Sequence, residues 1–203
     1  MTSKFLLAAV LSAASMFAAT LDVVFNGAIT SVTISRTINP SSTGTTSPTI
    51  VNAALLSYNV MSGSSVIGSL LTYCTEPQQS TGAINGGTIT YDIDPTLRNA
   101  PLNNGGISAG QSAALQQLFG LVPNAMSSGL SALDQAAMQV AIWEIVRESS
   151  LSFDATTGVV TFADDNTAGV VARANQLLAG LSSATPNTNL AFLTNDTFQD
   201  LIT

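Results

Sequence analysis

The sequence has 203 residues, enough for one domain with a substantial core, and its formal net charge is −7. The negative charge argues against nucleic acid and anionic membranes as partners. Hydrophobic residues make up 46% of the chain and charged residues only 8%, so Ser, Thr, Asn, Gln and Gly must cover most of the surface, as is common in exported proteins.

The N-terminus has the pattern of a secretory signal. Met1–Lys4 is a short positive start, and residues 5–17 are an apolar run broken only by small residues. This run is too short for a convincing membrane span, and we expect cleavage between residues 15 and 20. We therefore predict a signal peptide over residues 1–19, a single domain over residues 20–203 and a secreted or cell-surface location.

Three features of the composition restrict the chemistry. The absence of histidine excludes Cys–His and Ser–His–Asp hydrolases and histidine-based metal sites. Cys74 is the only cysteine, so no disulfide can form within the chain and its thiol needs an explanation. Lys4 is the only lysine and leaves with the signal peptide, so the net charge of the mature chain is about −8, from −7 minus one positive charge.

Alternating apolar and polar residues in the first half of the chain predict β-strands. A tight turn at Asn26-Gly27 is expected between the first two strands. The predicted strands cover residues 21–25, 28–38, 50–61, 66–75 and 88–93, the third with some helical ambiguity at residues 53–56. The fourth strand ends in Tyr73-Cys74-Thr75-Glu76 and is stopped by Pro77.

The composition then becomes alanine-rich, which predicts a helical section over about residues 108–181. Ser108 and Gln111 form a capping box for the first helix. Ser131 and Asp134 have the same spacing at the start of the second helix.

A hairpin and a third helix are expected in the rest of this section. Residues 153–154 and 159–162 are interpreted as the two strands of the hairpin. Asp165-Asn166-Thr167 is expected to cap the third helix, which Gly180 ends. Short strands are expected at residues 190–193 and 198–202. Together these elements predict an α+β fold, with β-sandwich-like strands at both ends of the chain and an inserted helical lobe of about three helices.

The second predicted helix is apolar at almost every position from Ala136 to Val146, so we expect protein to surround it on most sides. Gln139 lies on the same face of this helix as Trp143. A buried carboxamide costs about 1–3 kcal/mol unless it is satisfied. A hydrogen bond to a neighbouring strand or loop is one explanation for Gln139. The other needs a second residue, for which Cys74 is the candidate.

Two motifs resemble those of bacterial thioester domains, the Cys–Gln domains of surface adhesins. Tyr73-Cys74-Thr75-Glu76 resembles their aromatic-Cys-apolar-acidic motif, with Thr75 in place of the usual aliphatic residue. Met138-Gln139-Val140-Ala141-Ile142-Trp143 resembles their Thr-Gln-x-Ala-Ile-Trp motif, with Met138 in place of threonine. Residues 50–181 are similar to a subset from exported proteins with PEP-CTERM sorting tails, although no such tail follows Thr203.

The resemblance implies an internal thioester between the Cys74 sulfur and the Gln139 side-chain carbonyl, formed with loss of ammonia. In this family the bond covalently captures an amine, typically a lysine, of a partner protein or surface. No cofactor or metal is expected, and a single-turnover reaction would not make the protein an enzyme. Tyr73 and Trp143 could shield the bond, or be ordinary core aromatics. Glu76 could assist proton transfer, or be a solvated carboxylate at a strand end.

The sequence leaves a second function open. In that alternative the chain is a structural surface or matrix protein whose Cys–Gln bond is an unreactive staple or is not formed. A complement-type pairing of Cys and Gln three residues apart does not fit, because position 77 is proline. Acidic residues at positions 92, 94, 164 and 165 could suggest Ca²⁺, but such short clusters are usually solvated turns.

Overall fold

The computed structural model describes residues 19–38, 48–77, 86–100 and 105–203. Nearly all of the predicted signal peptide lies outside these residues. The chain divides into two compact units, each built from separate stretches of sequence. Among the described residues, the barrel unit contains those up to Ala28, those within Leu56–Ile107, and Asn189–Thr203. The helical unit contains Ile29–Leu55 and Ser108–Thr188.

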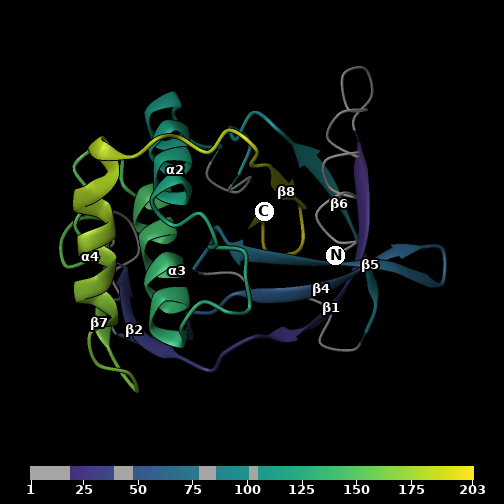
Figure 1. The fold of residues 1–203 in the computed structure, drawn as a ribbon, viewed down its shortest axis with the longest axis horizontal. Coiled ribbons are helices and arrows are strands. Elements are labelled where there is room, and N and C mark those ends of the chain that lie inside the picture. The colour runs from purple at the N-terminus through teal and green to yellow at the C-terminus, as the bar shows by residue number, and fades with distance from the viewer. Residues whose placement is uncertain (1–18, 39–47, 78–85, 101–104) are drawn as a thin grey trace. The chain divides into compact units, whose positions relative to one another are not determined.

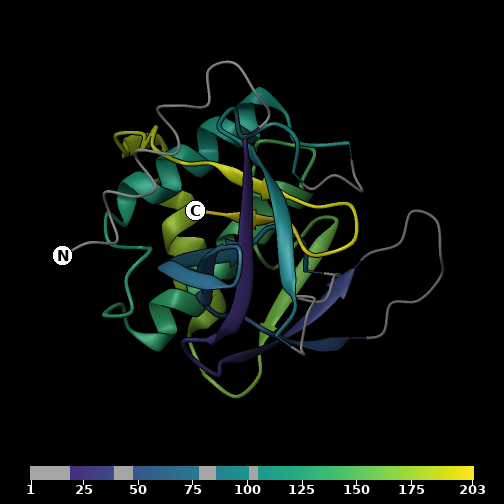
Figure 2. The ribbon, with the colours of Figure 1, turned by 90° about the vertical axis from the view of Figure 1, so that its right-hand side faces the viewer.

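The barrel unit is a closed antiparallel sheet in the order β1-β4-β5-β9-β8-β6. In Figure 2 the purple β1 and the teal β6 run side by side, as their pairing requires. The short last two strands complete the barrel, so the C-terminal end of the chain closes a sheet begun by its N-terminal part. The six strands are β1 (Thr20–Ala28), β4 (Leu56–Ser62), β5 (Ser65–Cys74), β6 (Thr88–Asp94), β8 (Phe192–Thr194) and β9 (Leu201–Ile202).

The helical unit combines a three-stranded antiparallel sheet with three helices. Its sheet has the order β3-β2-β7, formed by β3 (Thr49–Asn52), β2 (Thr33–Ile38) and β7 (Val160–Asp164). Its helices are α2 (Ala109–Leu121), α3 (Ala132–Arg147) and α4 (Val170–Gly180), followed by the single-turn 3₁₀ helix η2 (Leu181–Ser183). The three α-helices lie side by side in Figure 1, and α3 packs most extensively against α4.

The structure confirms the α+β fold class and the inserted section of three helices. The strands around that section close into a barrel, which the alternation of apolar and polar residues does not distinguish from a sandwich. The strands predicted at residues 66–75, 88–93, 190–193 and 198–202 are all present, with bounds that differ by a few residues. No helix in the described part of the chain is long and apolar enough to cross a membrane.

Two predictions in the N-terminal half are wrong. Asn26-Gly27 is no hairpin turn, because β1 continues through it and pairs with β4, with a shift in register between Phe25 and Gly27. Such a bulge bends an antiparallel strand without ending it. The apolar run at residues 50–61 is two strands, since Ala53–Leu55 separates β3 of the helical unit from β4 of the barrel unit.

The predicted hairpin in the helical section is also absent, because only its second half is a strand. β7 pairs with β2, so that Phe162 lies opposite Arg36. The Asp154 carboxylate instead accepts hydrogen bonds from the backbone and hydroxyl of Thr156, which makes a local turn.

The residue that caps α4 is Asp164, and the predicted cap at Asp165-Asn166-Thr167 is wrong. The Asp164 carboxylate accepts hydrogen bonds from the backbone N–H groups of Gly169 and Val171, at 2.6 and 2.9 Å. Gly169 has a φ of 88°, a left-handed conformation that glycine adopts without strain. The cap therefore comes from the end of β7 rather than from the residues next to the helix.

The capping box of α2 is confirmed, and one of its residues also caps a second helix. Gln111 accepts a hydrogen bond from the Ser108 backbone N–H, while its own backbone N–H donates to the Ser108 hydroxyl. The Gln111 side-chain nitrogen donates to the carbonyls of Ile145, Val146 and Glu148, at 2.8, 3.1 and 2.9 Å. Gln111 thus satisfies carbonyl groups at the C-terminal end of α3, which have no partner within that helix.

We predict that Gln111→Leu lowers the free energy of unfolding by about 1–3 kcal/mol, because it leaves buried carbonyls of α3 unsatisfied. Chemical denaturation followed by circular dichroism measures the change. Gln117→Leu is the matched control, since Gln117 is a half-buried residue of the same helix, and it should change stability by less than about 0.5 kcal/mol. Equal losses in the two variants would contradict a capping role for Gln111.

Candidate functional site

Cys74 is the last residue of β5 and is buried. The antiparallel pairing of β4 with β5 places Tyr58 opposite Leu70. Alternate residues of a strand share one face, so Thr72 and Cys74 lie on the same face of the sheet as Leu70 and Tyr58. That face is the interior of the barrel, because Tyr58 and Leu70 are both buried there. The sulfur therefore lies inside the barrel at the end of a strand.

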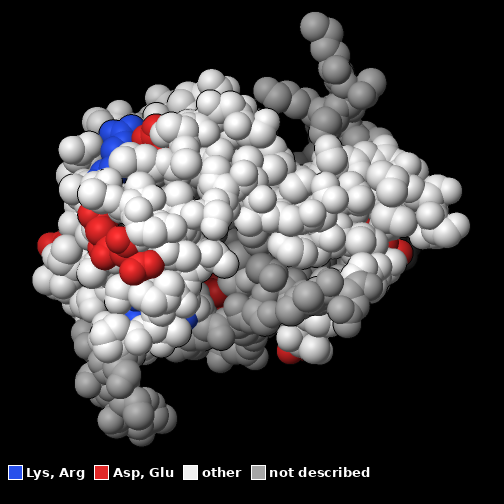
Figure 3. Space-filling model, turned by 90° about the horizontal axis from the view of Figure 1, so that it is seen from below, with Lys and Arg blue, Asp and Glu red and all other residues white. Residues whose placement is uncertain are grey.

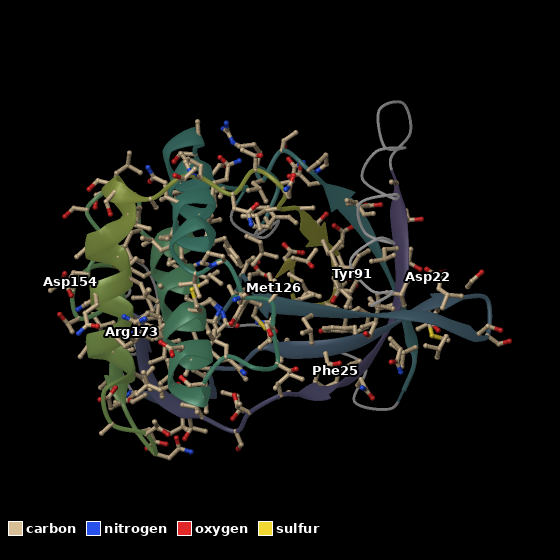
Figure 4. The ribbon with its side chains drawn as sticks, viewed as in Figure 1. Asp22, Phe25, Tyr91, Met126, Asp154 and Arg173 are labelled. Carbon is tan, nitrogen blue, oxygen red and sulfur yellow. The ribbon has the colours of Figure 1, made fainter. Side chains whose placement is uncertain are left out.

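Two tyrosines share the barrel interior with the thiol. Tyr58 and Tyr91 are both fully buried, and Tyr91, labelled in Figure 4, donates a hydrogen bond to the Gln199 carbonyl at 3.0 Å. Burial raises the pKa of each phenol, and interaction with Cys74 raises both further. Both hydroxyls therefore stay neutral near pH 7, so neither supplies a negative charge beside the sulfur.

Glu76 is buried, so its interpretation as a solvated carboxylate is wrong. Its carboxylate accepts a hydrogen bond from the Asp200 backbone N–H at 3.5 Å, and its backbone carbonyl accepts one from the Gln199 side chain.

Burial raises the pKa of the Cys74 thiol, and the charge of Glu76 raises it further. The thiol is consequently protonated at neutral pH, and this site disfavours the thiolate.

Tyr73 precedes the cysteine and lies on the opposite face of the strand. It is fully buried and pairs with Ile202 of β9. This burial agrees with the interpretation of Tyr73 as a core aromatic.

Gln139 lies in the middle of α3 and is fully buried. Every residue of the helix from Gln135 to Val146 is buried, which confirms that protein surrounds α3 on most sides. Gln135, one turn before Gln139, is also fully buried, and its amide donates to the Leu130 carbonyl and accepts from the Thr30 hydroxyl. Two carboxamides therefore share the same buried helix.

Trp143 follows Gln139 by one turn and stacks on Phe162 of β7. The two ring centroids are 6.0 Å apart and the ring planes differ by 15°. Trp143 is nearly fully buried, and its indole nitrogen has no hydrogen-bond partner among the described residues. The aromatic pair anchors α3 on the sheet of the helical unit.

The structure places the candidate residues in two groups. Cys74, Tyr73 and Glu76 lie in the barrel unit, whereas Gln139 and Trp143 lie in the helical unit. Within each unit the residues hold the buried positions that a protected bond requires. The bond between Cys74 and Gln139 stays a prediction.

The sequence did not single out Glu144, a fully buried carboxyl group on α3. One of its oxygens accepts a hydrogen bond from the Asp154 backbone N–H at 2.9 Å, and the other has no partner among the described residues. Burial raises the pKa of Glu144 from 4.5 to about 8, and the nearby charges of Glu148 and Asp154 add to the rise. Its position within the mostly apolar stretch of the helix, one turn before Glu148, was the only signal in the sequence.

Two of the acidic residues considered for Ca²⁺, Asp94 and Asp164, have other partners. Asp94 accepts backbone hydrogen bonds from Thr96, Arg98 and Asn99, and although burial acts to raise the pKa of Asp94, these bonds lower it overall. Asp164 caps α4. Among the residues that the structure describes, no group of three or more Cys, Asp or Glu side chains could hold a metal ion.

We predict that Glu144 makes the protein less stable as the pH rises from about 5 to 8. In this range the unfolded state has lost the proton that the folded state retains, so unfolding releases a proton and stability falls by up to about 1.4 kcal/mol per pH unit. Urea denaturation at several pH values measures this slope, which Glu144→Gln should reduce. Asp196→Asn, at an exposed position of the barrel unit, is the control and should leave the slope unchanged. An unaltered slope in Glu144→Gln would show that Glu144 is ionised in the folded protein.

Comparison with known proteins gives one similarity of structure. No family model matches the sequence, and no curated protein matches it. The structure is similar to the N-terminal thioester domain of a surface protein from Clostridium perfringens, with a TM-score of 0.40 and 11% identity, over 84% of this chain and 97% of that chain.

Proposed function

We propose that this chain is a secreted or cell-surface protein with an internal thioester between Cys74 and Gln139, which captures an amine on a partner. The observation that carries the proposal is the placement of the two motif residues. The only cysteine ends a barrel strand and faces the barrel interior, and the motif glutamine lies within the buried stretch of a helix.

The condensation that forms the bond is balanced by loss of ammonia. The Cys74 sulfur attacks the Gln139 side-chain carbonyl, the C–N bond breaks, and the thiol proton leaves with ammonia. The product has no ionisable thiol and no amide N–H donors at either position. Burial and the charge of Glu76 disfavour the thiolate but exert no such penalty on a neutral thioester, which therefore suits this environment.

The same environment would slow cleavage of the bond, whether by water or by an amine. Hydrolysis or aminolysis must expel the Cys74 sulfur, and a thiolate is a poor leaving group where its pKa is raised. An amine brings its own proton, which the departing sulfur accepts as the new amide to Gln139 forms. The partner is then linked covalently to the helical unit, and Cys74 returns to a thiol.

The composition supports capture of a foreign amine. The only lysine is Lys4, within the predicted signal peptide, so the mature chain could not react with the side chains of its own copies. The low content of charged residues explains the absence of lysine from the mature chain equally well. Each molecule reacts once, so the protein is a covalent trap rather than an enzyme.

Intact mass spectrometry of the secreted protein tests the thioester. We expect a mass lower by one ammonia than the sequence requires, and the normal mass in Cys74→Ala and in Gln139→Ala. Methylamine should add once to the wild type and release a thiol that iodoacetamide can label. Fragmentation should locate the methylamide at Gln139.

Gln135→Ala is the matched control, because Gln135 is a second fully buried glutamine on α3, one turn away. This variant should keep the mass deficit and the reaction with methylamine. A wild-type mass equal to that of the unmodified sequence, or a methylamide at Gln135, would refute the Cys74–Gln139 bond.

Burial of both residues also supports a second function, an unreactive staple in a structural surface protein. Cys74 is 5% exposed and Gln139 is 0% exposed, so a bond between them could be closed to every amine. A cross-link over 65 residues, from 139 minus 74, would stabilise the fold by about 4 kcal/mol if it acted like a disulfide. Both functions predict the mass deficit, but the staple predicts no reaction with methylamine in the folded protein.

A further inference from the structure

Arg36 and Arg147 lie close together in the helical unit. Arg36 is in the middle of β2, opposite Phe162 of β7, and residues directly opposite in an antiparallel pair have side chains on the same face of the sheet. The Phe162 ring stacks on Trp143 of α3, and Arg147 follows Trp143 by four residues, on the same side of the helix. The strand and the helix therefore direct both guanidinium groups toward the same region.

The charges of the two arginines interact. Burial lowers the pKa of Arg36, and the positive charge of Arg147 lowers it further. Both side chains are partly exposed, so the site can be reached from solvent. The Nε atom of each is nevertheless buried, and neither has a hydrogen-bond partner among the described residues.

No acidic side chain neutralises this pair. All of the Asp and Glu residues of the sequence lie within the described residues, where the ion pair found is Arg173 with Asp134. The acidic residues nearest to Arg147 in the sequence, Glu144 on α3 and its C-cap Glu148, have other partners. Glu144 accepts from the Asp154 backbone, and Glu148 from the Val159 backbone. The two positive side chains are therefore close to each other, and their Nε–H groups have no acceptor among the described residues.

We propose that Arg36 and Arg147 bind a small tetrahedral oxyanion of the phosphate or sulfate type. Each guanidinium group presents N–H donors in a planar fork that fits two oxygens, and a tetrahedral anion has enough oxygens for both forks. Such an anion would supply acceptors for the Nε atoms and remove the repulsion between the two charges. The Trp143–Phe162 stack beside them excludes water from one side, which strengthens the electrostatic attraction.

The site depends on local geometry, because the protein as a whole repels anions. The net charge of −7 gives no long-range electrostatic attraction for an anion. A bound oxyanion would also connect β2 with α3, and so stabilise the helical unit on binding.

Thermal denaturation and calorimetry with inorganic phosphate test this site. At constant ionic strength, phosphate should raise the melting temperature of the wild type relative to chloride, in proportion to the logarithm of its concentration. Sulfate should compete with phosphate, and acetate should act like chloride. Arg36→Gln and Arg147→Gln should each weaken phosphate binding at least tenfold. Arg147→Lys, which keeps the charge but loses the fork, should weaken it less.

Arg173→Gln is the matched control, because Arg173, labelled in Figure 4, is an arginine of the same unit that already pairs with Asp134 at 2.8 Å. Its affinity for phosphate should equal that of the wild type. Absence of a phosphate-specific shift in the wild type would overturn the proposal, as would equal affinities in the wild type and Arg147→Lys. If the glutamine variants do not fold, these two measurements still decide the outcome.

Discussion

The burial of α3 from Gln135 to Val146 is the constraint on which the helical unit depends. Polar groups on a helix surrounded by protein are costly unless they find partners inside the fold, because water cannot reach them. Gln135 meets this requirement with Leu130 and Thr30. Gln111 on α2 satisfies the carbonyls at the end of the helix, and Glu144 holds the backbone of Asp154. The polar groups of α3 thus determine how α2 and the segment before β7 pack against it.

Burial also restricts the chemistry of the Cys74 thiol and of the Gln139 carboxamide. In the barrel unit, Cys74 lies among neutral phenols and near the charge of Glu76, where a thiolate is unfavourable. In the helical unit, Gln139 occupies a position at which a polar side chain is costly unless it is satisfied. A thioester would remove the ionisable proton from one and the amide donors from the other. The proposed bond would therefore change both buried groups in one reaction.

The few charged residues have specific positions in this protein. The face in Figure 3 is mostly uncharged, in keeping with the 8% of charged residues in the sequence. Arg173 pairs with Asp134, and the Nε atom of Arg98 donates to the Ile107 carbonyl. Against this background, two adjacent arginines without a carboxylate need an explanation, and an external oxyanion provides one.

Local interactions could be predicted from the sequence because both partners lie within a few residues of each other. The Ser108–Gln111 capping box, the strand that ends at Cys74 and the apolar α3 are of this kind. Features that depend on distant residues could not be. Asn26-Gly27 became a bulge because β4 pairs across it, and Gln111 reaches carbonyls 34 and 35 residues away.

The sequence by itself determined the helical section, the strand-ending cysteine and the buried glutamine, because periodicity and capping are properties of neighbouring residues. Only the tertiary structure decided that the strands close into a barrel, that Glu76 and Glu144 are buried, and that Arg36 and Arg147 are directed toward the same region. Burial and strand pairing bring together residues far apart in the chain, and no local pattern specifies which ones will meet.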